Sequence, residues 1–147
     1  MKVGFIGLGN VGAKLAGSLL RNGADITVCD LDPERLLPFR NVGTTGTMQA
    51  AEVMRTCDFI ITCLPSPEAS DAVMCEMLPY VTSDKIWMEM STTDEAEVKR
   101  LGAKVIAAGG LAVDCPVSGG CHRAATGNIS IFAGCDRDTF EIILPLL

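Results

Sequence analysis

Three glycines near the start of the chain have the spacing of a phosphate-binding turn. The pattern is G-x-G-x-x-G, and its six residues are Gly7, Leu8, Gly9, Asn10, Val11 and Gly12. In such a turn the first glycine permits a tight bend, the second lets a pyrophosphate approach the backbone, and the third allows close helix–strand packing. A helix that starts here would offer unpaired N–H groups and a positive partial charge. The motif alone would also fit a strand–turn–helix connection with incidental glycines.

Asp30, about 20 residues further on, gives the motif its second element. A carboxylate at the end of the next strand can accept hydrogen bonds from the adenosine ribose hydroxyls. A 2′-phosphate there would be repelled by Asp30 and Asp32, by about 1 kcal/mol per charge in water and up to about 4 at an effective dielectric of 20. No arginine directly follows Asp30, although Arg35 is nearby. We therefore predict NAD rather than NADP, with a turn or helix-capping role for Asp30 as the alternative.

The elements that must position these residues alternate between short apolar runs and helical runs, which predicts a parallel sheet covered by helices. We expect one α/β domain over residues 1–147, a Rossmann-type, doubly wound, mostly parallel sheet with helices on both faces. Asp32 is the expected N-cap of a short helix that starts at Pro33, and Thr92 with Glu95 resembles a capping box. Strands are expected at 2–6, 25–29, 44–45, 58–64, 85–90, 111–114 and 128–133, and the other helices at 11–21, 47–56, 67–77, 93–108 and from 136 onward.

Composition excludes several classes of function. The 147 residues are 48% hydrophobic and 20% charged, and the net charge of −6 argues against binding nucleic acid or anionic membranes. We see no stretch of about 18 apolar residues and no signal peptide, and we expect a cytoplasmic protein. The seven cysteines include no C-x-x-C pair. No metal is predicted, because the spacing of the one conceivable set matches no zinc pattern: Cys115, Cys121, His122 and Cys135.

Four segments carry a family resemblance. Residues 4–20 resemble a glycine-rich signature, and residues 63–65 (CLP) resemble the end of a cofactor-lining strand. Residues 89–93 (EMSTT) resemble a D-x-S-T segment, and residues 114–120 (DCPVSGG) resemble a D-A-P-V-S-G-G segment. In this order along the whole chain, they are similar to the N-terminal domain of the β-hydroxyacid dehydrogenases. That family includes 3-hydroxyisobutyrate, tartronate semialdehyde and 6-phosphogluconate dehydrogenases.

The resemblance implies roles for residues outside the glycine turn. Leu64 and Pro65 would line the cofactor site, and the Thr92 hydroxyl would donate a hydrogen bond near the nicotinamide. Leu64-Pro65 could also be a plain strand end, and Thr92 could cap a helix, alone or in addition. The substrate carboxylate would be bound by the hydroxyl and N–H groups of Ser118, Gly119 and Gly120, unless this segment is an ordinary loop.

The sequence also departs from the family. Ala69 stands about where members often have a cofactor-contacting asparagine, and His122, the only histidine, is expected to be a partly exposed loop residue rather than a catalyst. The family's catalytic lysine lies in a second, all-helical domain, in a motif resembling G-x-x-x-K-x-x-x-N that does not occur here.

We therefore expect the NAD-binding part of an enzyme that oxidises a small 3-hydroxy acid, inactive alone and without catalytic residues of its own. The second domain, for catalysis and dimerisation, is expected to be absent from this chain. The full-length family implies a homo-oligomer. The alternative is a stand-alone NAD-binding sensor or interaction module.

Overall fold

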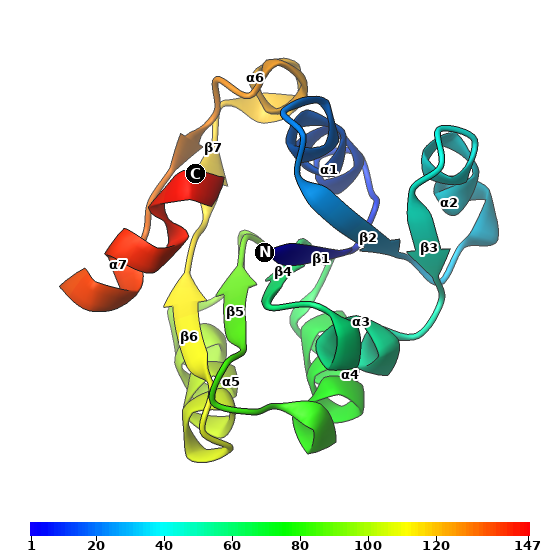
Figure 1. The fold of residues 1–147 in the computed structure, drawn as a ribbon. Helices are drawn as coiled ribbons and strands as arrows, with labels where there is room; N and C mark the ends of the chain where they lie inside the picture. The colour runs from blue at the N-terminus through cyan, green and yellow to red at the C-terminus, as the bar shows by residue number, and fades with distance from the viewer.

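Six parallel strands form the centre of the molecule in the computed structural model, which describes residues 1–147 (Figure 1). Their order is β3-β2-β1-β4-β5-β6, with every neighbouring pair parallel. This is the strand order of the Rossmann fold, so the predicted fold class is confirmed. The strands are β1 (Lys2–Ile6), β2 (Asp25–Cys29), β3 (Thr45–Thr47), β4 (Phe59–Thr62), β5 (Ile86–Glu89) and β6 (Leu111–Asp114).

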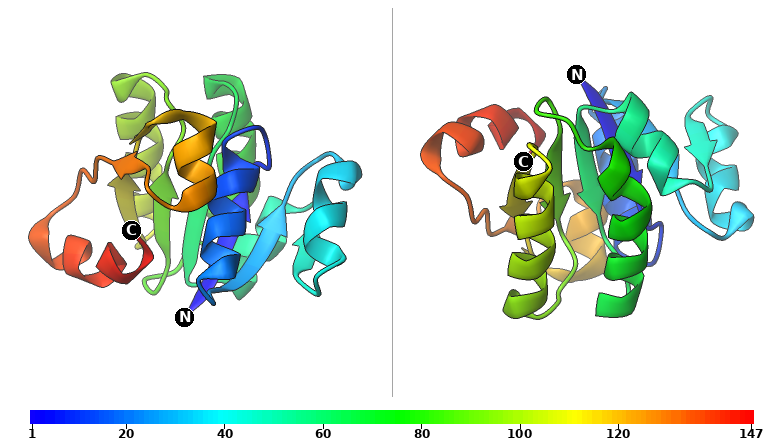
Figure 2. Two further views of the ribbon diagram at one scale, coloured as in Figure 1. Left: turned by 90° about the horizontal axis from the view of Figure 1, so that it is seen from above. Right: turned by 90° about the horizontal axis from the view of Figure 1, so that it is seen from below.

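Helices cover both faces of the sheet (Figure 2). One face packs against α3 (Ala50–Thr56), α4 (Pro67–Met77) and α5 (Glu95–Ala107), through a core that includes the fully buried Trp87. The opposite core takes residues from the other helices, which are α1 (Gly12–Arg21), α2 (Pro33–Arg40), α6 (Gly120–Thr126) and α7 (Arg137–Ile143). The central strand β4 is buried at all four positions, as expected for a parallel strand covered on both sides.

Two element boundaries near β3 differ from the predictions. The strand covers Thr45–Thr47, so Thr44 lies outside it. Thr47 ends the strand and does not begin the next helix, which starts only at Ala50. The reason is the partner strand: Thr47 is in register with Cys29, the last residue of β2.

The strand expected at 128–133 is shorter and belongs to a second sheet. β8 (Ser130–Ile131) pairs antiparallel with β7 (Val117–Ser118), and Phe132 beyond it is exposed. An isolated bridge between Asp114 and Gly134 is the only pairing of this segment with the large sheet's last strand. The apolar run therefore packs over the α1 side rather than extending the parallel sheet.

Helix α5 has a different cap from the one expected. The Asp94 side chain accepts a hydrogen bond from the N–H of Ala96 at 2.7 Å, so Asp94 is the N-cap and the Thr92–Glu95 capping box is wrong. The other predicted cap is confirmed: Asp32 accepts from the N–H of Glu34 at the start of α2. Thr92 is consequently free for another role.

The final segment is helical, as predicted, but not continuous. Asp136 caps α7, which ends at Ile143, and a single 3-10 turn, η2 (Leu144–Leu146), follows it. Pro145 lies in this turn; proline lacks the N–H that an α-helical bond would need. None of the helices combines the length and apolar character needed to cross a membrane.

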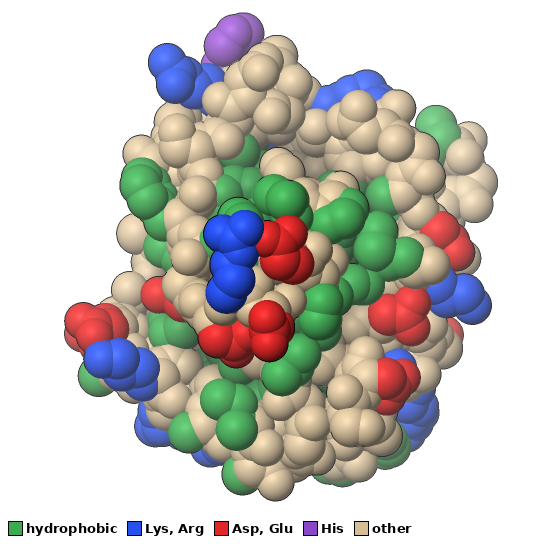
Figure 3. All heavy atoms as spheres, turned by 60° about the vertical axis from the view of Figure 1, so that its left-hand side comes forward, with side chains coloured by type: hydrophobic (Ala, Val, Ile, Leu, Met, Phe, Trp, Pro, Cys, Tyr) green, Lys and Arg blue, Asp and Glu red, His purple; other side chains and the backbone are tan.

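The face shown in Figure 3 carries basic and acidic side chains close together, without an extended basic patch. On α4 and α5, Arg100 lies within ion-pair distance of both Asp71 and Glu97. Such exposed pairs contribute little to stability, about 0–1 kcal/mol each.

Candidate functional site

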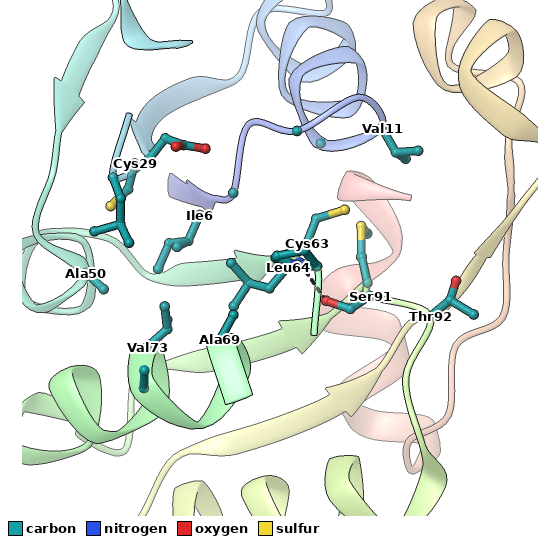
Figure 4. A pocket seen from close by; sticks show the side chains of 18 of the residues that line it. Ile6, Val11, Cys29, Ala50, Cys63, Leu64, Ala69, Val73, Ser91 and Thr92 are labelled. Atoms are coloured by element: carbon teal, nitrogen blue, oxygen red, sulfur yellow. Dashed lines mark hydrogen bonds between the residues drawn. The ribbon is translucent and has the colours of Figure 1, made fainter. Parts of the chain in front are cut away.

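A cavity of about 570 Å³ opens at the carboxyl ends of the strands. It is lined by the turn after β1, the end of β2, the segment before α3, the ends of β4 and β5, and the face of α4 (Figure 4). In open parallel sheets this edge, where the strand order reverses, is where ligands bind. In Figure 4, Cys29 and Ala50 lie at one end of the cavity, and Val11 and Thr92 at the other.

The three glycines of the turn have three different environments. Gly7 has φ +97°, and a Cβ there would lie 2.3 Å from the carbonyl oxygen of Cys63. A Cβ on Gly12 would lie 2.0 Å from the carbonyl oxygen of Gly7. Gly9 lines the cavity, yet a Cβ there would meet no atom within 4 Å. Gly7 and Gly12 are therefore required by the protein's own packing, whereas Gly9 leaves space that only a ligand can use.

The main chain of the turn offers an anion site. The N–H groups of residues 9–12 make no hydrogen bond within the protein, and α1 begins at Gly12 without a side-chain cap. Four consecutive free donors at the positive end of a helix are suited to a phosphate group. Leu8 differs from its neighbours, because its side chain is buried in the core and its N–H is already bound by Asp30.

Asp30 connects the end of β2 to the glycine turn. Its Oδ2 accepts from the N–H of Leu8 at 2.7 Å, and its Oδ1 accepts from the N–H of Asp32 at 2.9 Å. The guanidinium of Arg35 lies 3.6 Å from Oδ2 and 3.5 Å from the carboxylate of Asp32. The carboxylate is 8% exposed and lines the cavity. It therefore has both the turn-stabilising role that the sequence left open and access to a ligand.

The ends of β4 and β5 are joined at the middle of the cavity. Ser91 Oγ accepts from the N–H of Leu64 at 2.7 Å, the dashed line in Figure 4, and both residues line the cavity with Pro65. The N–H of Ser91 in turn donates to Glu89 Oε1 at 2.8 Å. Sequence reasoning missed these roles of Ser91 and Glu89, although both residues belong to the EMSTT segment that carried the resemblance.

Glu89 is fully buried at the end of β5. Its Oε2 has no hydrogen-bond partner, and burial raises the pKa of the carboxyl group, although the hydrogen bonds from Ser91 oppose this shift. Strand β5 ends at Glu89, and Thr92, three residues further on, is exposed and lines the cavity. The buried acid thus supports the segment that presents Thr92 and Ser91 to a ligand.

The predicted substrate loop reaches the cavity only in part. Gly120 lines it, together with Val117, whereas Ser118 and Gly119 are exposed beside it. Gly119 has φ +135° and precedes α6, a conformation that favours glycine. His122 is exposed on α6, not in a loop, and it does not line the cavity.

Two thiols also line the cavity. Burial raises the pKa of Cys29 to about 12 and that of Cys63 to about 11, so both stay protonated at neutral pH. All seven cysteines are free, and no three His, Cys, Asp or Glu side chains are gathered so that they could hold a metal ion. Ala69 lines the cavity with a methyl group where an asparagine was considered.

The doubly wound sheet, the glycine turn with its free amides, and the carboxylate at the end of β2 define a dinucleotide-binding domain of the Rossmann class. Residues 2–147 match the family described as the NAD binding domain of 6-phosphogluconate dehydrogenase, and the chain belongs to this family. Its cofactor is a nicotinamide dinucleotide.

The relatives include both enzymes and a nuclear factor. Mouse mitochondrial 3-hydroxyisobutyrate dehydrogenase is 34% identical over 99% of this chain and 44% of its own length. The cytokine-like nuclear factor N-PAC of Pongo abelii is 33% identical over 95% of this chain and 26% of its own length. The structure of Mycobacterium tuberculosis 3-hydroxyisobutyrate dehydrogenase with L-serine superposes with a TM-score of 0.94, at 27% identity, over 99% of this chain and 50% of that one. This chain thus spans half or less of the length of each.

Proposed function

We propose that this chain is the NAD-binding half of a dehydrogenase that oxidises a small 3-hydroxy acid. The observation that carries the proposal is the cavity at the strand ends, which is bordered by the free N–H groups of residues 9–12 and by Asp30. When bound, NAD would supply the hydride acceptor. The residues of this chain would hold it, orient it and shape the substrate entrance.

The cofactor would lie across the glycine turn, with its pyrophosphate against the main chain of Gly9, Asn10, Val11 and Gly12. Gly7 and Leu8 shape the turn, and Asp30 would accept from the ribose hydroxyls. The nicotinamide would lie at the opposite end, near Thr92, whose hydroxyl is free because Asp94 caps α5. Leu64 and Pro65 would form the apolar floor between the two ends.

Charge at the adenosine end supports NAD over NADP. Asp30 and Asp32 outnumber Arg35, so a 2′-phosphate would meet a net negative charge even with the arginine beside it. The Glu52 and Glu76 carboxylates add to the negative potential here, because both raise the pKa of the nearby Cys29 thiol. Binding of NADP, whose 2′-phosphate adds two negative charges, would therefore be disfavoured relative to binding of NAD.

Titration calorimetry with the two cofactors tests this preference. We expect NAD to bind between about fivefold and a thousandfold more tightly than NADP, from a repulsion of about 1 to 4 kcal/mol. In Asp30→Asn, which keeps one acceptor oxygen, the ratio should fall by about tenfold, while Asp25→Asn, at the opposite end of β2, should leave it unchanged. Tighter binding of NADP by the unmodified chain would refute the assignment.

The substrate carboxylate would be bound by Ser118, Gly119 and Gly120, beside the nicotinamide end of the cavity. Oxidation of the hydroxy acid would move a hydride from its carbinol carbon to NAD, and the hydroxyl proton to a base. Three lysines of this chain give no such base: Lys85 is buried and donates to the carbonyl of Cys57, and Lys99 and Lys104 pair with acids on α5 and α4. We infer that the base belongs to a second domain outside this chain, which would also form the dimer contact.

A comparison of chain lengths tests the enzymatic part of the proposal. We expect the 147-residue chain to bind NAD but to form no NADH with 3-hydroxyisobutyrate, measured by absorbance at the NADH band. A longer protein, in which the reading frame of this chain continues into a helical domain, should reduce NAD with that substrate. If the natural reading frame ends at Leu147 and the chain binds NAD without turnover, it is a binding module instead.

A cytoplasmic location likewise stays a prediction, since the mouse relative is mitochondrial by name.

A further inference from the structure

We propose that Glu76 selects adenine as the base of the dinucleotide. Of all the side chains that line the cavity, two are charged, Asp30 and Glu76. Asp30 lies next to the glycine turn and would face the ribose, whereas Glu76 is an exposed residue of α4 at the rim of the cavity. The inference rests on the proposed function, since it assumes that NAD occupies this cavity.

Apolar residues line the end of the cavity near Asp30, which we call the apolar slot. Met48 and Ala50, at the start of α3, line this slot together with Ala72 and Val73 of α4. Figure 4 places Ala50 and Val73 at the Cys29 end of the cavity, away from Thr92. A slot with small apolar walls is suited to a flat aromatic base, and the ribose at Asp30 would direct the adenine into it.

Glu76 is held by one oxygen and leaves the other free. Its Oε1 accepts from the N–H of Ala51 at 3.0 Å, in the first turn of α3, whose own N-cap Gln49 makes no side-chain hydrogen bond. Its Oε2 makes no hydrogen bond within the protein. The carboxylate also lies near Cys29, which lines the same end of the cavity, because after burial the charge of Glu76 is the largest cause of the raised pKa of that thiol.

The free oxygen has a clear chemical preference. An ionised carboxylate can only accept hydrogen bonds. Adenine carries an N6 amino group that donates, whereas guanine and hypoxanthine have a carbonyl oxygen at the equivalent position. Where it meets this position, an accepting oxygen therefore favours adenine over the other two bases, because two acceptors would face each other there without a proton.

Nicotinamide hypoxanthine dinucleotide is the decisive probe, because it differs from NAD only at this group and by a proton on the adjacent ring nitrogen, and carries the same charge. In calorimetric titration of the 147-residue chain, we expect NAD to bind at least about tenfold more tightly than this analogue, as for other hydrogen bonds to charged groups. Equal affinities would overturn the role of Glu76 while leaving the proposed function intact. If neither dinucleotide binds, the proposed function fails as well.

Glu76→Gln should then change the preference without disturbing the fold. The amide keeps an oxygen for the N–H of Ala51 and places an NH₂ donor where Oε2 was, which can pair with the carbonyl of hypoxanthine. The ratio of the two affinities should fall to near one or reverse. Glu52→Gln is the matched control, because Glu52 also carries charge near Cys29 but does not line the cavity. An equal change of the ratio in both variants would show a general field effect and overturn the proposal.

Discussion

Gly9→Val is expected to abolish cofactor binding while leaving the fold intact. A Cβ at this position meets no protein atom within 4 Å, so a side chain has open space beside the cavity, where the pyrophosphate would lie against residues 9–12. The loss of two or more hydrogen bonds to a charged group, at about 1.5–3 kcal/mol each, lowers the affinity for NAD by at least about 100-fold. Calorimetric titration and thermal unfolding of the same sample measure the two effects separately.

Two other glycines provide the comparison. Gly12→Ala puts a methyl group 2.0 Å from the backbone oxygen of Gly7, and the expected result is lower stability, by about 1–3 kcal/mol. Gly17→Ala, further along α1, meets only the flexible end of Arg21 and should leave NAD affinity unchanged with equal or higher stability. Unchanged NAD binding by Gly9→Val would contradict the placement of the pyrophosphate at this turn.

The elements whose signals are local were predictable from the sequence. The strands β1, β2 and β6 have the expected bounds, because glycines, charges and helix caps delimit their apolar runs. The glycine turn and Asp30 also lie together at the cavity, as strand order in a Rossmann sheet requires. These predictions needed only residue types and spacing along the chain.

The contacts that were missed depend on neighbours distant in sequence. The Ser91–Leu64 hydrogen bond joins two strand ends 27 residues apart, and β8 left the main sheet because its partner was Val117. Asp94 rather than Thr92 caps α5, although both residue types are good N-caps. The path of the chain after β5 decides which of the two side chains can reach the N–H groups in the first turn of α5. Residue type alone could not distinguish them.

Glu89 is another such residue, and its burial has a measurable consequence for stability. Its carboxyl pKa is raised in the folded protein, chiefly by burial, and the charge of Asp114 on the neighbouring strand acts in the same direction. Below the ordinary glutamate pKa, both the folded and the unfolded chains hold the proton, and Glu89 carries no penalty. As the pH rises above about 4.5, the unfolded chain releases the proton first, so the unfolded state gains stability.

Glu89→Gln removes this titration while keeping an oxygen for the N–H of Ser91. We expect the wild type to lose free energy of unfolding relative to the variant, by up to about 1.4 kcal/mol per pH unit, until the pH reaches the raised pKa of Glu89. Urea unfolding of both proteins from pH 4 to pH 8 measures the difference between their free energies of unfolding. The contributions of the other carboxylates to the pH dependence cancel in this difference, because both proteins contain them. A difference that stays constant over this range would show that Glu89 titrates alike in both states.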